Sequence, residues 1–204
     1  MRPRIVALVA GGAFALAATL TAFTMLVGSW APQDGVRTTG VAAVGGPFTL
    51  TDETGRQVTE AELLGRPSVI FFGFTYCPDV CPTTLYEMSN LMERLGPKAD
   101  RMNWVFVSVD WERDGPEEMR AYLQAFDERI RGFTGTKEQI DAITSAYKVF
   151  YERVPTGEGE GDYTINHTAS VFLMDGKGGF VGTLGYGEDA DTMLAKLERL
   201  AAGG

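Results

Sequence analysis

Cysteine and histidine are scarce in this chain of 204 residues, which contains two cysteines and one histidine. The cysteines, Cys77 and Cys81, lie four positions apart, and the histidine, His167, lies far along the chain. The lack of a second histidine and of a hydrolytic base argues against a zinc hydrolase. The lack of a separate resolving cysteine argues against a thiol peroxidase. Cys77, Cys81 and His167 are therefore the first candidates for the chemistry of this chain.

Charge is absent from residues 5–27, a stretch long enough to span the hydrocarbon core of a bilayer. Arg2 and Arg4 precede it, which by the positive-inside rule keeps the N-terminus on the inner side. Residues 27–31 offer only a poor signal-peptidase site. We therefore expect residues 1–30 to form an uncleaved N-terminal transmembrane helix rather than a cleaved signal peptide.

Basic residues are in the minority, with 18 lysines and arginines against 27 aspartates and glutamates and a net charge of −9. Because Arg2 and Arg4 belong to the anchor, the rest of the chain carries 16 basic against 27 acidic residues, or −11. Such a surface argues against nucleic acid as a partner. It favours electrostatic encounter with a basic patch on a partner protein.

The part beyond the anchor divides into a tether and one domain. Residues 31–46 are rich in glycine and proline and poor in large apolar groups, which predicts a flexible tether. Residues 47–204 have the length of one ordinary domain, and the hydrophobic fraction of 45% is sufficient for a core. We find no internal repeat.

Two continuous apolar runs, residues 68–74 and 103–110, predict buried strands of a parallel-type sheet. Between them, the apolar spacing of residues 82–95 predicts a helix. Turn, capping and alternation signals predict the remaining elements. These are a hairpin at 48–58, a helical turn at 59–65, helices at 114–127, 136–148 and 189–200, and strands at 131–134, 149–154, 168–174 and 180–184.

This order of elements predicts an α/β fold of the thioredoxin-like type, in which helices cover a central sheet. The cysteine pair opens the helix after a central strand, and a hairpin plus a helix close the chain. Residues 155–162, rich in glycine and acids, interrupt the plan as an added loop or hairpin. The cysteine spacing also departs from the thioredoxin pattern, because three residues rather than two separate the cysteines.

Cys77 and Cys81 enter a predicted helix, where backbone N–H groups and the helix dipole favour a thiolate. Cysteines at i and i+4 lie on one helix face, near enough for a disulfide or for two ligands on one metal. A bridge closing so short a loop adds little stability. A structural disulfide is therefore a weak explanation of the pair, whereas redox chemistry and metal binding both stay open.

His167 offers a third ligand. Two thiolates and one imidazole suit copper best among the common metals, although zinc would accept the same set. Asp79 and Asp110 are helix-start and strand-end residues that could also act as second-sphere groups. Apart from the redox-capable cysteines, no catalytic residue is indicated. In an oxidising compartment the thiols would need a supply of electrons.

Three segments of the domain resemble the Sco/SenC family of membrane-anchored, thioredoxin-like copper proteins. The resemblance extends over about residues 45–202 and is carried by residues 76–82, 108–110 with 113–114, and 162–168 leading into 171–175. Two positions depart from the family pattern. Trp111 stands where many members have proline, and Asn166 stands where an aspartate usually precedes the histidine.

The resemblance implies that Cys77, Cys81 and His167 bind one copper ion, Cu(I) or Cu(II), and that the two cysteines can also form a disulfide. His167 would lie in the loop that the family adds to the thioredoxin plan. The family delivers copper to, or reduces the thiols of, the binuclear copper A site in cytochrome c oxidase subunit II. The domain would then face the periplasm, or the mitochondrial intermembrane space, from a single-pass inner-membrane anchor.

Three functions are consistent with these residues. The first is a non-enzymatic metallochaperone that receives copper from a donor chaperone and passes it to the oxidase subunit. The second is a thiol:disulfide oxidoreductase that reduces the cysteines of that subunit and is itself recharged by a reductant of the thioredoxin type. The third is a redox or copper sensor, for which the sequence has no feature of its own.

Overall fold

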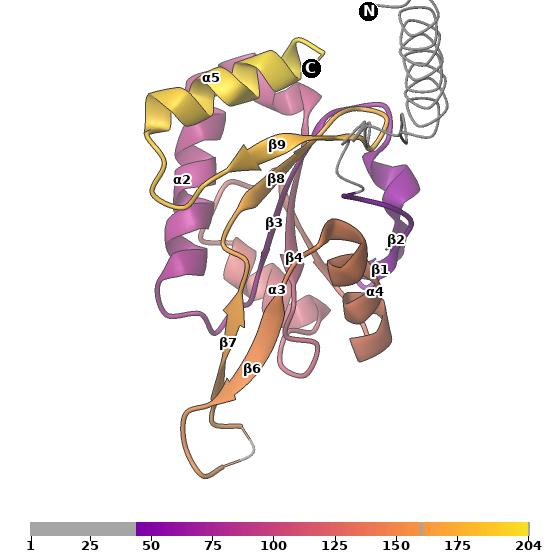
Figure 1. Cartoon of the computed structure of the whole chain (residues 1–204), viewed down its shortest axis with the longest axis vertical. Coiled ribbons are helices and arrows are strands. Elements are labelled where there is room, and N and C mark those ends of the chain that lie inside the picture. Colours follow the sequence, from indigo (N-terminus) through magenta and orange to yellow (C-terminus); the bar gives the residue numbers. More distant parts are fainter. Residues whose placement is uncertain (1–43, 160, 204) are drawn as a thin grey trace, which may run out of the picture. The chain divides into compact units, whose positions relative to one another are not determined.

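The computed structural model describes residues 44–159 and 161–203. Its strands are β1 (Thr49–Asp52), β2 (Gln57–Thr59), β3 (Ser68–Gly73), β4 (Asn103–Ser108), β5 (Ile130–Thr134), β6 (Tyr151–Pro155), β7 (Tyr163–His167), β8 (Val171–Met174) and β9 (Phe180–Leu184). Its helices are α2 (Val80–Leu95), α3 (Pro116–Leu123), α4 (Lys137–Tyr147) and α5 (Ala190–Ala201), with 3₁₀ turns η1 (Glu60–Leu63) and η2 (Gly96–Arg101). Within these residues, seven strands form one sheet in the order β2-β1-β5-β4-β3-β8-β9 (Figure 1).

The centre of the sheet is formed by β3 and β4, whose residues are all buried. They pair in parallel, and β3 pairs antiparallel with β8 on its other side. Strands covered on both faces need apolar side chains in both directions, which explains the continuous apolar runs of the sequence. The predicted α/β fold is confirmed, and a central strand leads directly into the segment that holds both cysteines.

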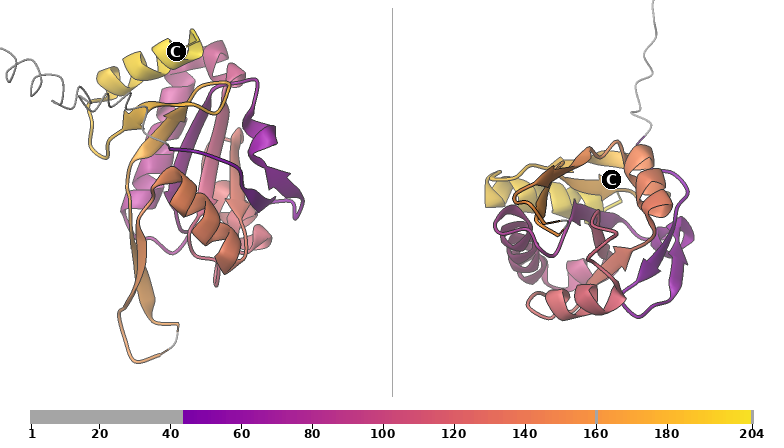
Figure 2. Two further views of the ribbon diagram at one scale, coloured as in Figure 1. Left: turned by 45° about the vertical axis from the view of Figure 1, so that its right-hand side comes forward. Right: turned by 90° about the horizontal axis from the view of Figure 1, so that it is seen from below.

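Helices cover both faces of the sheet. On one face Phe71 stacks on Phe106, which in turn packs against Tyr122 of α3. On the other face Phe72 contacts Tyr147 of α4, with ring centroids 5.5 Å apart. Figure 2 shows α2 and α5 together on one side of the sheet and α4 on the opposite side. The alternating directions of successive side chains in β3 therefore supply two separate layers of core.

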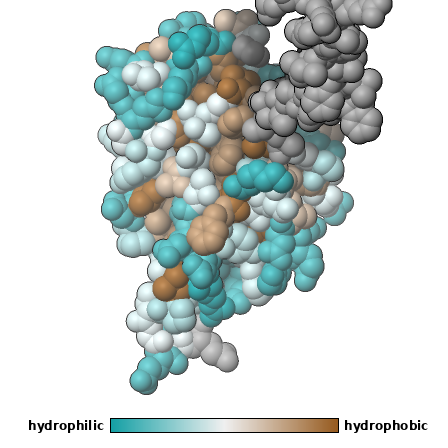
Figure 3. Space-filling model, in the orientation of Figure 1, coloured by the Kyte–Doolittle hydropathy of each residue, from teal (hydrophilic) through white to brown (hydrophobic). Residues whose placement is uncertain are grey.

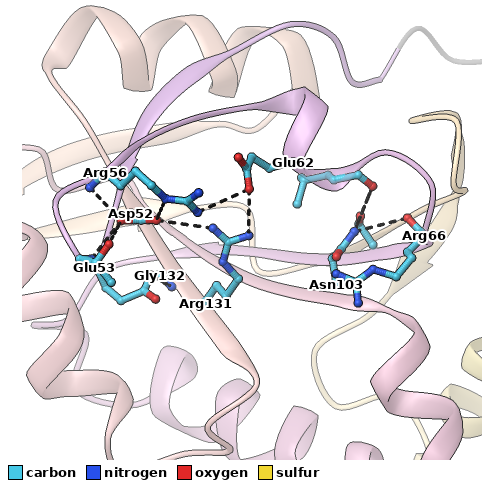
Figure 4. Close-up of polar contacts among 11 residues, drawn as sticks. Asp52, Glu53, Arg56, Glu62, Arg66, Asn103, Arg131 and Gly132 are labelled. Carbon is cyan, nitrogen blue, oxygen red and sulfur yellow. Dashed lines mark hydrogen bonds and ion pairs between the residues drawn. The ribbon is translucent and has the colours of Figure 1, made fainter.

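A network of ions and hydrogen bonds attaches the β1–β2 hairpin to β5 (Figure 4). Asp52 accepts hydrogen bonds from Thr54 and from the backbone N–H and Nε of Arg56. Arg131 of β5 lies 3.6 Å from the same carboxylate and 3.8 Å from Glu62. Although burial acts to raise it, these hydrogen bonds hold the pKa of Asp52 below its ordinary value. The carboxylate is thus ionised where the hairpin joins the sheet.

Helix boundaries follow the predicted signals in one case and not in another. Thr136 and Gln139 form a complete capping box at the start of α4, as predicted. Helix α3 was predicted to continue to residue 127 but ends at Leu123. After it the chain continues in turns, with the Phe126 N–H donating to the Leu123 carbonyl, and the Asp127 N–H donates to Ser89 of α2 instead of to its own helix.

The interruption predicted at residues 155–162 is the end of a hairpin, β6–β7, that pairs only with itself among the described residues. Figure 1 shows it projecting beyond the sheet, and in Figure 3 its tip is mostly hydrophilic to neutral, with apolar residues where it meets the domain. His167 was expected just before a strand over 168–174. It is instead the last residue of β7, and β8 begins only at Val171.

The predicted membrane helix, residues 1–30, and nearly all of the predicted tether, residues 31–46, lie outside the described residues. Among the helices that the structure does describe, none is both long enough and apolar enough to cross a bilayer.

The two-sided core gives a stability prediction. Phe72→Ala removes a fully buried ring that contacts both Tyr147 and Phe172, so the free energy of unfolding should fall by about 3–5 kcal/mol in denaturant titrations. Val181→Ala, at a side chain that is 46% exposed, is the control and should change it by no more than about 0.5 kcal/mol. Equal effects of the two substitutions would contradict this description of the core.

Candidate metal centre

The turn between β3 and α2 places both cysteines at the start of the helix. Cys77 precedes the first turn, which begins at Val80, and Cys81 lies within it. The Cys77 N–H donates to the Phe74 carbonyl oxygen at 3.3 Å, and the Cys81 N–H donates to Cys77 Sγ at 3.4 Å. Both cysteines are free thiols, Cys81 buried and Cys77 half-buried. The first cysteine thus accepts a backbone N–H at the helix start, as its position predicted.

Gly73 makes room for the buried sulfur. A Cβ atom at this position would lie 2.7 Å from Cys81 Sγ and 2.8 Å from the Phe106 ring, closer than real side chains approach. Residue 73 ends β3, so the sulfur lies directly against the backbone of the central strand. Position 73 must be glycine because of this contact between strand and helix, and the sequence contained no signal for such a contact.

His167 meets the cysteines from the β6–β7 hairpin. Its Nε2 lies 3.4 Å from Cys81 Sγ, and its Nδ1 lies 3.0 Å from the Thr168 carbonyl oxygen. Because a carbonyl oxygen only accepts, we assign the proton of the neutral ring to Nδ1, which leaves the lone pair of Nε2 facing the sulfur. The ring packs against Phe71 and Phe74, with centroids 6.1 and 5.8 Å away.

The structure therefore brings together all three side chains singled out in the sequence. Cys77 Sγ, Cys81 Sγ and a nitrogen of His167 all lie within 4.8 Å of one another. Ligands on one ion with bonds of about 2.0–2.3 Å are separated by roughly 3.5–4.5 Å, so only a small closure is needed. Two sulfurs and an imidazole nitrogen, backed by aromatic rings, form a donor set that fits a soft transition metal.

The two thiols share one negative charge. A hydrogen bond from the Cys81 thiol lowers the pKa of Cys77 to about 4, with further help from the backbone N–H groups of the helix start against the opposing effect of burial. The same hydrogen bond and burial raise the pKa of Cys81 well above its ordinary value. The pair therefore presents a Cys77 thiolate beside a Cys81 thiol, and a metal ion would displace the remaining proton.

Asp114 supports the cysteine turn from behind. Its buried carboxylate accepts hydrogen bonds from the Thr75 N–H at 2.8 Å, the Thr75 hydroxyl at 2.5 Å and the Ser108 hydroxyl at 2.6 Å. Burial raises the pKa of this carboxyl above its ordinary value in spite of these bonds. The sequence interpretation assigned this acid to a helix start and to a segment that carries the resemblance, whereas its hydrogen bonds link the ends of β3 and β4.

The two acids predicted as possible second-sphere groups lie in different environments. Asp79 is exposed, and among the described residues its side chain accepts only a long 3.4 Å hydrogen bond from Thr83. Asp110 is buried and bonds to Arg113 at 2.5 Å and to the Tyr163 hydroxyl at 2.6 Å, rather than to any of the three candidate ligands. Of the two, Asp110 is the one connected to the hairpin that carries the histidine.

Comparison with known proteins identifies the family of this chain. A family model described as SCO1/SenC matches residues 36–202. The chain belongs to the SCO1/SenC family. Among its curated relatives, the mitochondrial protein SCO1 homolog 1 of Arabidopsis thaliana is 35% identical over 155 residues, which are 76% of this chain and 46% of the relative. The chain spans about half the length of the first curated relatives that it matches.

Solved structures of the SCO1/SenC family share the fold. The structure of Bradyrhizobium japonicum ScoI with copper bound has a TM-score of 0.72 at 44% identity and covers 78% of this chain and 99% of that one. Yeast Sco1 with copper bound has a TM-score of 0.72 at 34% identity, covering 77% of this chain and 87% of that one. The thioredoxin-like α/β fold expected from the sequence is therefore that of Sco proteins.

The shared charge of the cysteines gives a pH prediction. In the metal-free, reduced chain, alkylation of Cys77 by iodoacetamide should keep a nearly constant rate from pH 8 down to about pH 5 and halve near pH 4, because the thiolate persists until its lowered pKa is reached. Cys81→Ala removes the main cause of that lowering, so the midpoint should move to higher pH. A tenfold loss of rate per pH unit below pH 8 in the wild type, as for an ordinary thiol with a pKa of about 8.5, would contradict the assignment.

The contact at Gly73 gives a second prediction. Gly73→Ala inserts a methyl group against Cys81 Sγ and should weaken metal binding to the reduced chain, measured by competition with a chelator. Gly182→Ala is the matched control, because nothing lies within 4 Å of its added Cβ. Retention of full affinity in Gly73→Ala would show that the sulfur can shift without cost to the site.

Proposed function

We propose that this protein is a copper metallochaperone rather than an enzyme, and that it carries one copper ion as cargo on Cys77, Cys81 and His167. The observation that carries the proposal is the convergence of two thiol sulfurs and one imidazole nitrogen within 4.8 Å. This donor set can hold Cu(I) through its sulfurs and Cu(II) with the added nitrogen. Two structures of relatives that contain bound copper support the choice of metal.

Transfer would proceed by ligand exchange. Cys77 is the more exposed sulfur, so an incoming thiolate of the acceptor reaches it first, while buried Cys81 and His167 retain the ion. The acceptor that we propose is the binuclear copper A domain of cytochrome c oxidase subunit II, in keeping with the role of the family. A donor chaperone would load the site, and a thioredoxin-type reductant would keep the two thiols reduced.

The proposed setting is a membrane surface. Residues 1–30 would anchor the chain in the inner membrane as a single span, and residues 31–46 would tether the domain, 47–204, in the periplasm or the mitochondrial intermembrane space. A charge of −11 beyond the anchor would then favour encounter with a basic surface on the partner.

A second candidate function is thiol:disulfide exchange with the oxidase subunit, and it is favoured by the Cys77 thiolate. In that reaction Cys77 attacks one sulfur of the acceptor disulfide and releases the other as a thiolate. Cys81 then attacks the mixed disulfide, so the acceptor leaves with two thiols and the pair is oxidised to a Cys77–Cys81 disulfide. This reaction needs both cysteines but has no need of a nitrogen ligand.

His167→Ala distinguishes the two functions. For a metallochaperone, the reduced full-length chain should bind one equivalent of copper, and His167→Ala should lose the thiolate-to-Cu(II) absorption and fail to assemble the copper A site. For a reductase, the same variant should still reduce the disulfide of subunit II and support assembly when copper is supplied freely.

Copper stoichiometry tests the ligand set directly. Cys77→Ser should abolish stoichiometric Cu(I) binding by the reduced chain, because one sulfur and a nitrogen hold Cu(I) less tightly than two sulfurs. Thr83→Ser, a hydroxyl side chain in the same helix, serves as the control and should bind copper normally. If Cys77→Ser bound one equivalent as tightly as the wild type, the site assignment would be wrong.

A further inference from the structure

The hairpin that carries His167 is held by contacts other than strand pairing. In the described residues, β6 and β7 pair with each other and with no strand of the seven-stranded sheet. The Phe71 and Phe74 rings contact the imidazole itself. At the other end of β7, Tyr163 is fixed to the segment that follows β4. The place of the imidazole therefore depends on how firmly Tyr163 is held.

A cluster of five side chains, which we call the Tyr163 clamp, fixes that end of the hairpin. Its members are Asp110, Glu112, Arg113, Arg153 and Tyr163. The Tyr163 hydroxyl donates to Asp110 at 2.6 Å, and Arg113 Nη1 donates to the Tyr163 carbonyl oxygen at 3.1 Å. Arg153 of β6 donates to the carboxylate of Glu112 at 2.7 and 2.8 Å.

Arg113 is the member that also reaches the cysteines. Its Nε donates to Asp110 at 2.5 Å, and its guanidinium carbon lies 3.6 Å from the centroid of the Tyr163 ring. The same carbon lies 4.6 Å from the centroid of Tyr76, the residue immediately before Cys77. Arg113 thus touches the histidine hairpin and the cysteine turn at once.

The stacked position of Arg113 costs free energy, because it leaves one N–H group of the guanidinium buried and unpaired within the described part of the chain. Its Nη2 is buried and finds no hydrogen-bond partner among the described residues. An unpaired buried donor is unfavourable, so the stacking and the two remaining hydrogen bonds must offset it. Stacking a planar guanidinium on aromatic faces is an interaction that lysine cannot reproduce.

We infer that Arg113 is a positioning residue for His167, holding the hairpin where the imidazole completes the metal site. This inference rests on the proposed function, because it takes the two cysteines and the histidine as ligands of one copper ion. Its consequence depends on the oxidation state of the metal. Two thiolates retain Cu(I), whereas Cu(II) is held well only with the nitrogen ligand as well. Loosening the hairpin therefore weakens Cu(II) binding and spares Cu(I).

Arg113→Gln in the full-length chain tests this selectivity. The dissociation constant for Cu(II) should rise roughly 10- to 100-fold, the usual effect of removing a group that orients a ligand, with a weaker thiolate-to-Cu(II) absorption. The dissociation constant for Cu(I), measured against a Cu(I) chelator, should stay unchanged. The Cu(II)/Cu(I) reduction potential should then rise by about 59 mV for each tenfold loss of Cu(II) affinity relative to Cu(I) affinity.

Arg129→Gln is the matched control. Arg129 is also an ion-paired arginine, bound to Asp127 and Asp100, but it precedes β5 at the end of the sheet opposite to the cysteine turn. This substitution should change neither copper affinity. Equal weakening of Cu(I) and Cu(II) by Arg113→Gln, or an unchanged Cu(II) affinity, would overturn the inference. If instead the wild type and His167→Ala showed the same Cu(II) spectrum, the proposed function itself would fail.

A measurement without copper distinguishes local loosening of the hairpin from a general loss of stability in the variant. In the metal-free chain, backbone amides of β7 should exchange with solvent faster in Arg113→Gln, while those of β3 and β4 keep their protection. If Arg113→Gln does not fold, Tyr163→Leu should give the same selective loss of Cu(II), and Tyr163→Phe, which keeps the ring, should lie between it and the wild type. Unchanged exchange in β7 would also contradict the role assigned to Arg113.

Discussion

Burial of the Cys81 sulfur against the end of the central strand is the contact on which the candidate metal centre depends. Gly73 leaves the space, and the first turn of α2 brings the sulfur into it. With Cys81 buried, a single thiolate forms at the more exposed Cys77, and the Nε2 of His167 meets the inner sulfur. The division into a buried inner sulfur and a more exposed, reactive one follows from close packing against one glycine.

Much of the fold could be predicted because it depends on local patterns. The continuous apolar runs of β3 and β4 and the capping box of α4 were sufficient to place those elements. The end of α3 was not predictable in this way, since the Asp127 N–H that follows it bonds to Ser89 of another helix. An added loop or hairpin was expected around residues 155–162, but the strand β7 that pairs with β6 was not. His167 was singled out by its rarity and does lie beside the two cysteines, but its place as the last residue of β7 was not expected.

The supporting groups of the site were less accessible from the sequence than its three candidate ligands. The presence of cysteine and histidine indicates metal or redox chemistry from residue type alone. Gly73, Asp114 and Arg113 are ordinary residues whose roles exist only through contacts across the fold. Asp110 shows the same limit, since its position after a strand was noted but its bonds to Tyr163 and Arg113 were not foreseeable. Residue type predicts ligands, and tertiary contacts determine how firmly they are held.

The attachment of the histidine hairpin has a thermodynamic consequence. Cys81 and His167 are separated by 86 positions and lie on parts of the chain that share no strand ladder within the described residues. An ion bound to both acts as a reversible crosslink, so its binding free energy also resists separation of the hairpin from the sheet. Release of the ion removes that crosslink and leaves only the side-chain contacts. The loaded and empty forms would then differ in rigidity at one surface, which gives a partner a physical basis for telling them apart.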